Sequence, residues 1–166
     1  MIVKKKKNKK PIVFVGMSGG VDSSVAALIL KKQGYNVIGI FIRSWSDKSL
    51  ANCPWEEDSR DARLVAEKLN IPFYVWDFED EYKKSVVNYM VETYKKGITP
   101  NPDVVCNKKI KFGLFLERAI KLGADFIATG HYVRKIEDKN HCNRLIQSKD
   151  LNKDQSYFLW QLNQNQ

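Results

Sequence analysis

Short apolar runs alternate with segments of helical periodicity along most of the chain. Four runs have the length and the β-branched content of buried strands, at residues 12–17, 37–42, 72–78 and 124–128. Four longer segments place apolar residues on one helical face, at residues 21–32, 56–70, 80–95 and 111–122. This alternation predicts an α/β fold built on a doubly wound parallel sheet with helices on both faces. Ligands of such folds bind at the carboxyl ends of the strands.

The connecting segments carry turn and loop residues. Gly34 and Gly97 follow two of the predicted helices, where glycine commonly ends a helix. Residues 44–52 are irregular and polar, and residues 98–107 form a proline-containing loop. Beyond the last strand, the pattern indicates a polar hairpin over residues 132–146, with its turn at 138–143, and a helix beginning within residues 154–162.

Composition narrows the class of protein. With 166 residues, 43% of them hydrophobic, the chain can bury the core of one domain. No apolar run approaches the ~20 residues that span a bilayer, and the N-terminus lacks a secretory signal, so we expect a cytoplasmic protein with no membrane partner. Three cysteines, Cys53, Cys106 and Cys142, lie far apart without a C-x-x-C pair. A zinc knuckle or a disulfide scaffold is therefore not expected.

The positive charge is concentrated at the N-terminus. Removing the six lysines of residues 4–10 from the net charge of +9 leaves +3 for the rest of the chain. Residues 1–10 are therefore predicted to be a basic disordered tail, and net charge gives only weak support for a nucleic-acid partner. We expect no DNA partner.

A glycine-rich loop joins the first predicted strand to the first predicted helix. Its sequence, Ser18-Gly19-Gly20-Val21-Asp22-Ser23, lies where the free N–H groups of a helix N-terminus bind anions. The loop has no lysine, which excludes the Walker phosphate loop, and it lacks the dinucleotide fingerprint. Asp22 suits either a helix cap or a Mg²⁺ contact, so no metal ligand is assigned. A plain turn is the alternative for the loop taken alone.

A second motif surrounds one of the cysteines. The segment from Thr99 to Phe112 reads T-P-N-P-D-V-V-C-N-K-K-I-K-F, with Pro100 and Pro102 expected to stiffen a loop. Cys106 precedes Lys108 and Lys109, and positive charge favours the nucleophilic thiolate. A small buried hydrophobe is the alternative for this cysteine.

The two motifs together carry a resemblance to a known family. S-G-G-x-D-S resembles the PP-loop of adenylating enzymes with the adenine nucleotide alpha hydrolase-like fold, such as GMP synthetase and NAD synthetase. P-N-P-D-x-x-C-N-x-x-I-K-F, combined with that loop, closely resembles the tRNA 2-thiouridylases. Further matches are Gly39-Ile40-Phe41-Ile42, Asp61-Ala62, Ala128-Thr129-Gly130-His131-Tyr132 and Asn152-Lys153-Asp154-Gln155-Ser156-Tyr157-Phe158.

The resemblance implies a set of site residues. Those matching ATP contacts, with Mg²⁺ accompanying the nucleotide, are Gly16, Met17, Ser18, Gly19, Gly20, Val21, Asp22, Ser23, Ile42, where many members carry methionine, and Gly130. Those matching contacts to the target base or the rest of the tRNA are Asn101, Pro102, Asp103, His131, Lys153, Asp154 and Gln155. Cys106 matches the first catalytic cysteine, and Asp103 is a candidate for proton transfer. Without the resemblance, His131 suits a surface position and residues 153–155 an ordinary helix start.

The resemblance also implies a reaction and a domain division. The C2 oxygen of the wobble uridine (U34) in tRNAs for Lys, Glu and Gln would be adenylated. A persulfide, loaded by a cysteine desulfurase or a sulfur-relay protein, would then deliver sulfur, with Cys106 forming a disulfide. Residues 11–150 would be the PP-loop domain, and residues 151–166 would begin a tRNA-contacting linker or helix, with the family's downstream domains outside this chain.

The sequence leaves two alternatives for the function of the chain. The family's second cysteine follows the K-D-Q-S-Y-F stretch, whereas Cys142 precedes it. The chain could therefore be an ATP- and tRNA-binding fragment that adenylates at most. Another adenylating enzyme of the superfamily would share the glycine-rich loop but has no reason to carry P-N-P-D-x-x-C.

Overall fold

The computed structural model describes residues 10–45, 54–150, 152–164 and 166. The predicted basic tail, apart from Lys10, and Cys53 lie outside this part of the chain.

A parallel sheet forms the centre of the structure. Its strands are β1 (Ile12–Gly16), β2 (Asn36–Arg43), β3 (Phe73–Asp77) and β4 (Phe126–Ala128), in the order β3-β2-β1-β4. Val15 of β1 pairs with Gly39 of β2 on one side and with Ala128 of β4 on the other. The predicted doubly wound parallel sheet is confirmed. The chain passes from β1 to β2 and on to β3 at one edge, and then crosses back to β4 on the other side of β1, so the strand order reverses beside β1. Such a switch point opens a crevice at the carboxyl ends of the strands.

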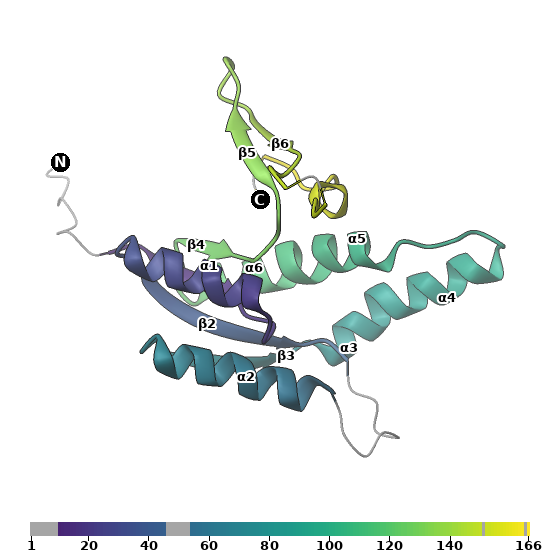
Figure 1. Cartoon of the computed structure of the whole chain (residues 1–166). Helices are drawn as coiled ribbons and strands as arrows, with labels where there is room; N and C mark the ends of the chain where they lie inside the picture. The colour runs from purple at the N-terminus through teal and green to yellow at the C-terminus, as the bar shows by residue number, and fades with distance from the viewer. Residues whose placement is uncertain (1–9, 46–53, 151, 165) are drawn as a thin grey trace, which may run out of the picture.

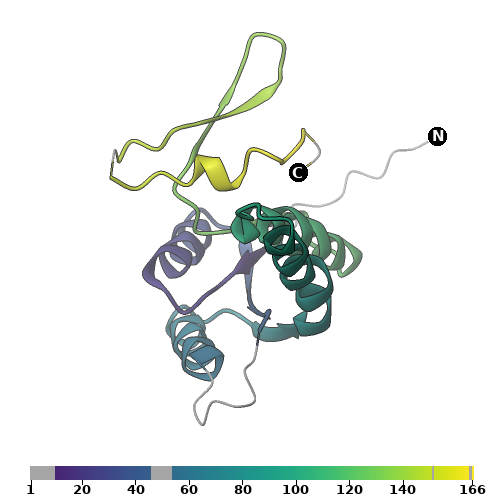
Figure 2. The ribbon, with the colours of Figure 1, turned by 90° about the vertical axis from the view of Figure 1, so that its right-hand side faces the viewer.

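Helices cover both faces of the sheet (Figures 1 and 2). On one face, α1 (Val21–Lys32) and α2 (Pro54–Lys68) bury Ala27, Ala62 and Ala66 against residues of β1 and β2. On the other face lie α3 (Glu79–Tyr82), the π-helix η1 (Lys83–Val87), α4 (Asn88–Lys95), α5 (Pro102–Cys106), the π-helix η2 (Asn107–Phe115) and α6 (Leu116–Lys121). These helices bury Val86, Ile110 and Phe115 against Phe14, Ile40 and Trp76.

One predicted loop is helical. We expected residues 98–107 to form a loop that ends before a helix at 111, but the helix begins at Pro102 and runs through α5, η2 and α6 to Lys121. The expectation was wrong because proline is tolerated in the first turn of a helix, where its missing N–H costs nothing. The Asn101 side chain accepts a hydrogen bond of 3.2 Å from the Val104 N–H and so caps this start.

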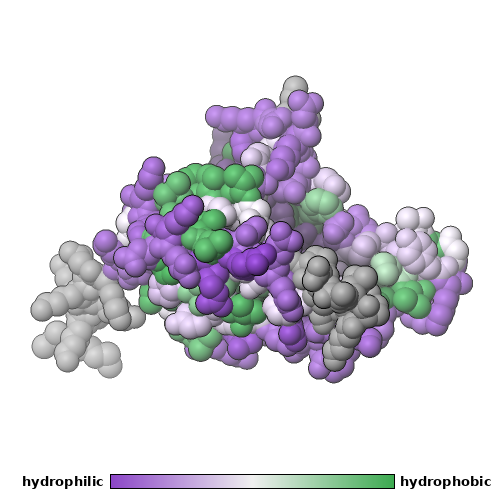
Figure 3. Space-filling model, turned by 60° about the horizontal axis from the view of Figure 1, so that its bottom comes forward, coloured by the Kyte–Doolittle hydropathy of each residue, from purple (hydrophilic) through white to green (hydrophobic). Residues whose placement is uncertain are grey.

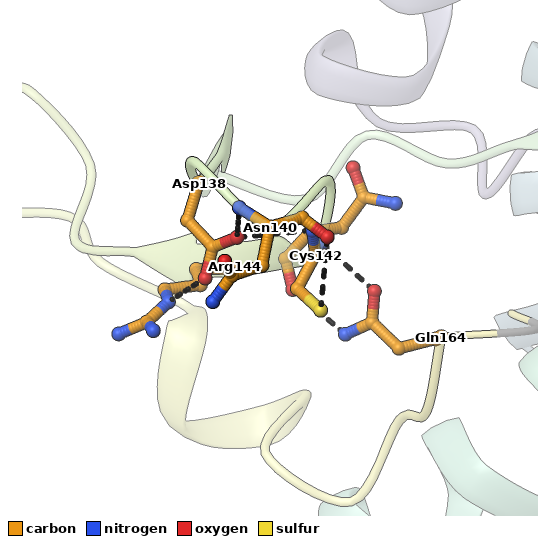
Figure 4. Close-up of polar contacts among 6 residues, drawn as sticks. Asp138, Asn140, Cys142, Arg144 and Gln164 are labelled. Carbon is orange, nitrogen blue, oxygen red and sulfur yellow. Dashed lines mark hydrogen bonds and ion pairs between the residues drawn. The ribbon is translucent and has the colours of Figure 1, made fainter.

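The predicted hairpin is present above the sheet (Figure 1). Strands β5 (Arg134–Glu137) and β6 (Asn143–Ile146) pair antiparallel. Asp138 holds the turn, since its carboxylate accepts hydrogen bonds from the N–H groups of Asn140 and Cys142 and from Arg144 Nε, at 2.8 to 3.0 Å (Figure 4). Cys142 therefore belongs to a turn with its own hydrogen-bond network, and it is exposed.

The C-terminal segment differs from its prediction. In place of a helix over residues 154–162 there is one 3₁₀ turn, η3 (Ser156–Phe158), flanked by turns. Asp154 explains the difference, because its carboxylate accepts hydrogen bonds from the Ser148 N–H and the Ser156 hydroxyl, at 3.0 and 2.7 Å. These bonds tie the segment back to the chain after β6 and give its backbone an alternative to helix.

The surface is mixed in character. Over the face drawn in Figure 3, hydrophobic residues form separate patches within a largely hydrophilic surface. Within the described ranges, no helix has the length and the apolar composition needed to cross a membrane.

The packing of the core lets us predict how much stability the chain loses when one aromatic ring is removed. Phe115 is fully buried and its ring meets Trp76 edge-on, with centroids 5.7 Å apart. Phe115→Ala should lower the free energy of unfolding by about 3–5 kcal/mol, measured by urea denaturation. Phe126→Ala removes a ring that is 54% exposed, and its cost should stay under about 1 kcal/mol. Equal losses of unfolding free energy in the two variants would contradict the difference in burial between Phe115 and Phe126.

Candidate functional site

A cavity of about 600 Å³ opens at the carboxyl ends of β1, β2 and β4. This is the crevice that the strand order predicts, and its size is usual for a small-molecule site. Ten of the residues predicted from the sequence line it, namely Gly16, Met17, Ser18, Asp22, Ser23, Ile42, Cys106, Gly130, His131 and Gln155. The cavity therefore brings the glycine-rich loop and Cys106 together, although Ser23 and Cys106 are 83 positions apart in the sequence.

The glycine-rich loop leads into the N-terminus of α1. Gly20 is the N-cap residue, and as a glycine it has no side chain to accept a hydrogen bond from the N–H groups of the first turn. The Ser23 hydroxyl accepts a hydrogen bond of 3.1 Å from the Ser18 N–H, and the Ser24 hydroxyl donates one of 2.8 Å to the Gly20 carbonyl. The loop is held in shape by its own serines, while the first turn of α1 keeps N–H groups available to an anion.

Two glycines allow other backbone segments to approach this loop. A methyl group at Gly130 would lie 2.6 Å from Ser23 N and 2.7 Å from the Asp22 carbonyl carbon. Gly19 has a φ of +84° and lies against α2, where a methyl group would meet the Asp58 carbonyl oxygen at 2.6 Å. Only glycine fits at either position without moving the backbone. The cradle around the loop is thus formed by β4 and α2 as well as by β1.

An aromatic wall lines the cavity beside β2. Trp45 and Trp55 contribute to the lining, and neither was predicted as a site residue. The Arg43 guanidinium lies over the Trp55 ring at 5.2 Å and pairs with Asp77 and with Glu79. These contacts fix the ring, which gives the cavity a flat apolar surface suited to a nucleobase.

Cys106 lies at the end of α5 and faces the cavity. Burial raises the pKa of its thiol, the Lys111 ammonium opposes this, and the Asp103 carboxylate raises the pKa further. The expectation that nearby lysines favour the thiolate was therefore wrong on balance, because desolvation outweighs the positive charge. Lys108 and Lys109, on which that expectation rested, are exposed.

Lys111 is the lysine that reaches the cavity, and the π-helix η2 explains how. In an α-helix, a residue five positions after Cys106 would be turned about 140° away from it. The i→i+5 bonding of η2 widens the helix, so that residues 106 and 111 both face the cavity. No pattern of residues around Cys106 had indicated a π-helix.

His131 follows the end of β4 and is half-buried. Its Nδ1 lies 2.7 Å from the Thr129 hydroxyl, and its ring lies 6.0 Å from the ring of Phe112. Burial, helped by the Lys111 charge, lowers the pKa of His131 to about 4. The imidazole is therefore neutral at pH 7 and offers one donor and one acceptor.

The segment of residues 153–155 docks beside β4. Gln155 exchanges two hydrogen bonds with the backbone of Tyr132, at 2.9 and 3.0 Å. Lys153 Nζ lies 2.7 Å from Asp22 Oδ2 and 4.2 Å from the centre of the Tyr132 ring. The hydrogen bond from Lys153 holds the pKa of Asp22 below its usual value.

The other predicted residues are not among those that line the cavity. These are Gly19, Gly20, Val21, Asn101, Pro102, Asp103, Lys153 and Asp154. Asp103 is exposed, one helical turn before Cys106. Among the described residues, no three His, Cys, Asp or Glu side chains lie close enough together to hold a metal ion.

The charges around Cys106 predict its reactivity. Lys111→Met should raise the pKa of Cys106 and slow its alkylation by iodoacetamide at pH 8 several-fold, whereas Asp103→Asn should speed it. The rate is followed by mass spectrometry of the peptide containing Cys106. Lys109→Met is the matched control and should leave the rate unchanged. A similar slowing in both lysine variants would contradict the role given to Lys111.

The environment of His131 predicts a pH dependence. His131 should titrate near pH 4 in an NMR titration of the His141→Gln variant, which leaves it as the one histidine of the chain. Because its pKa is lower in the folded chain, the unfolded chain binds more protons between about pH 6.5 and 4, so the free energy of unfolding falls as the pH falls through that window. A midpoint near 6.5 would show that the imidazole is not buried.

Comparisons with known proteins agree with this architecture. A family model described as tRNA methyl transferase HUP domain matches residues 11–166. The U34-tRNA thiolase NcsA from Methanococcus maripaludis, solved with its [4Fe-4S] cluster, superposes with a TM-score of 0.52 at 24% identity, covering 75% of this chain and 39% of that one. At that identity the likeness concerns the fold alone.

Sequence relatives are much closer. The tRNA-specific 2-thiouridylase MnmA from Flavobacterium johnsoniae is 57% identical over 160 residues, covering 93% of this chain and 40% of the relative. The protein of the same name from Exiguobacterium sibiricum is 52% identical over 168 residues, covering 100% and 44%. The chain thus spans about two fifths of the length of these relatives. It belongs to the tRNA methyl transferase HUP domain family, together with the tRNA-specific 2-thiouridylases that its sequence resembles.

Proposed function

We propose that this chain binds ATP in the cavity and acts in the 2-thiolation of a uridine in tRNA. The observation that carries the proposal is the meeting of the S-G-G-V-D-S loop and Cys106 on the wall of one cavity. An anion site and a thiol at one crevice suit a reaction in which activation by ATP is followed by sulfur chemistry.

The residues present fit a nucleoside triphosphate. The uncapped first turn of α1 and the close approaches at Gly19 and Gly130 suit the phosphates, and the wall of Ile42, Trp45 and Trp55 suits the adenine. Asp22, in the first turn of α1, is the candidate to meet the accompanying Mg²⁺.

The chemistry requires activation because the uridine C2 oxygen is a poor leaving group. ATP would supply an AMP group to that oxygen. The chain's own residues would hold and orient the reactants: Asn101 to Asp103 near the base, His131 and residues 153–155 on the tRNA. Asp103 is exposed, one helical turn from Cys106, where a carboxylate can accept the N3 proton of a base.

The transfer of sulfur requires groups other than those that line the cavity. In the proposed reaction, the outer sulfur of a persulfide on a second cysteine attacks C2 and displaces AMP, which carries away the former C2 oxygen. Cys106 then attacks the Sγ of that cysteine and breaks its S–S bond, so that a disulfide joins the two cysteines and the outer sulfur stays on the base. The second cysteine would come from outside these 166 residues, and a cysteine desulfurase or a relay protein would load it. The finer proposal is that the base is U34 of tRNAs for Lys, Glu and Gln, modified in the cytoplasm.

Release of pyrophosphate from ATP tests the activation step. The chain should release pyrophosphate with unmodified tRNA and not with pre-thiolated tRNA. Asp22→Ala should reduce the release at least about tenfold, because it removes the carboxylate at the phosphate site. Cys106→Ser should retain it, since the thiol acts after activation.

The outcomes separate the candidate functions. Binding of ATP without pyrophosphate release, with any tRNA, would leave a nucleotide- and tRNA-binding fragment. Pyrophosphate release at the same rate with and without tRNA would contradict a tRNA substrate. Loss of release in Cys106→Ser would contradict the order of steps proposed here.

A further inference from the structure

The phosphate loop lacks a cation of its own. Between Gly16 and Ser24 the one charged residue is Asp22, and the lysines of α1 lie in its last turn, at Lys31 and Lys32. The triphosphate of a nucleotide carries several negative charges, whereas N–H and hydroxyl groups supply only partial positive charges. A lysine ammonium commonly supplies the full charge at such sites.

The fold brings one lysine to the loop from far along the chain. Lys153 Nζ lies 2.7 Å from Asp22 Oδ2, although the two residues are 131 positions apart. Asp22 lies in the first turn of α1 and lines the cavity. The Lys153 ammonium is therefore at the N-terminus of α1, where the loop's N–H groups are.

Hydrogen bonds hold the backbone of the segment in place, while the Lys153 side chain is partly exposed to solvent. Gln155 is fixed to the backbone of Tyr132, and Ser148 Oγ lies 2.6 Å from the Lys153 carbonyl oxygen. The Lys153 side chain is nevertheless 43% exposed. A lysine ammonium with this exposure is charged at neutral pH.

We propose that Lys153 is a ligand of the nucleotide's phosphates, which exchanges the Asp22 carboxylate for phosphate oxygens when ATP binds. The inference rests on the proposed function and deepens it, since the family resemblance matches this position to tRNA contacts only. The triphosphate of a nucleotide carries more negative charge than one carboxylate, and a lysine side chain can turn from the carboxylate to the phosphates without moving the backbone. The same exchange releases Asp22.

Binding measurements without RNA test the exchange. Affinities for Mg²⁺-ATP, for pyrophosphate and for adenosine are measured by calorimetry on the 166-residue chain. Lys153→Met should weaken binding of Mg²⁺-ATP and of pyrophosphate about tenfold or more, because it removes a charge-assisted bond. Adenosine affinity should not change. Lys153→Arg should retain most of the phosphate affinity, and Lys149→Met, an exposed lysine of the same segment, is the matched control.

Several results would overturn the inference. ATP and pyrophosphate affinities within about twofold of the unchanged chain, with weaker tRNA binding, would make Lys153 an RNA contact alone. An equal loss for adenosine would show that the substitution disturbs the cavity as a whole, and thermal unfolding of each variant checks its fold. Failure of the unchanged chain to bind ATP would instead overturn the proposed function itself.

Discussion

The end of β4 meets the first turn of α1 with no side chain between them. A methyl group at Gly130 would collide with the backbone of Asp22 and Ser23, so this contact exists only because residue 130 is glycine. It holds the loop after β1 against the loop after β4, across the switch point of the sheet. The cavity, the neighbourhood of His131 and the docking of residues 153–155 beside Tyr132 all depend on that approach.

Around this cavity, the buried titratable groups and the positively charged groups are different side chains. Burial raises the pKa of Cys106 and lowers that of His131, so both groups are uncharged at neutral pH. The positive charge is carried by Lys111 and Lys153, which reach the site from η2 and from the C-terminal segment. A site of this kind attracts anions through its lysines and keeps its thiol protonated until another charge changes the balance.

The sequence predicted those elements that depend on residues close together in the chain. The strands and α1 follow from short-range apolar periodicity, and glycine with a positive φ follows α1 at Gly34 as expected. The motifs identified most of the cavity's polar lining. The helix from Pro102 was missed because its cap and its proline resemble loop residues, and η2 was missed because π-helical bonding leaves no simple periodic trace. The raised pKa of Cys106 and the Asp22–Lys153 pair result from tertiary packing, which a sequence window does not contain.

The separation between Asp22 and Lys153 has a consequence for the order of folding. Closing a loop of 131 residues carries a large entropic cost when the intervening chain is unfolded, and a small one after the sheet has formed. We therefore expect the pair to form late in folding, after β4 has paired with β1 and Gln155 has formed its hydrogen bonds with Tyr132. During synthesis, the glycine-rich loop is made 131 residues before Lys153, so the Asp22 carboxylate lacks this partner while the strands between them are being made.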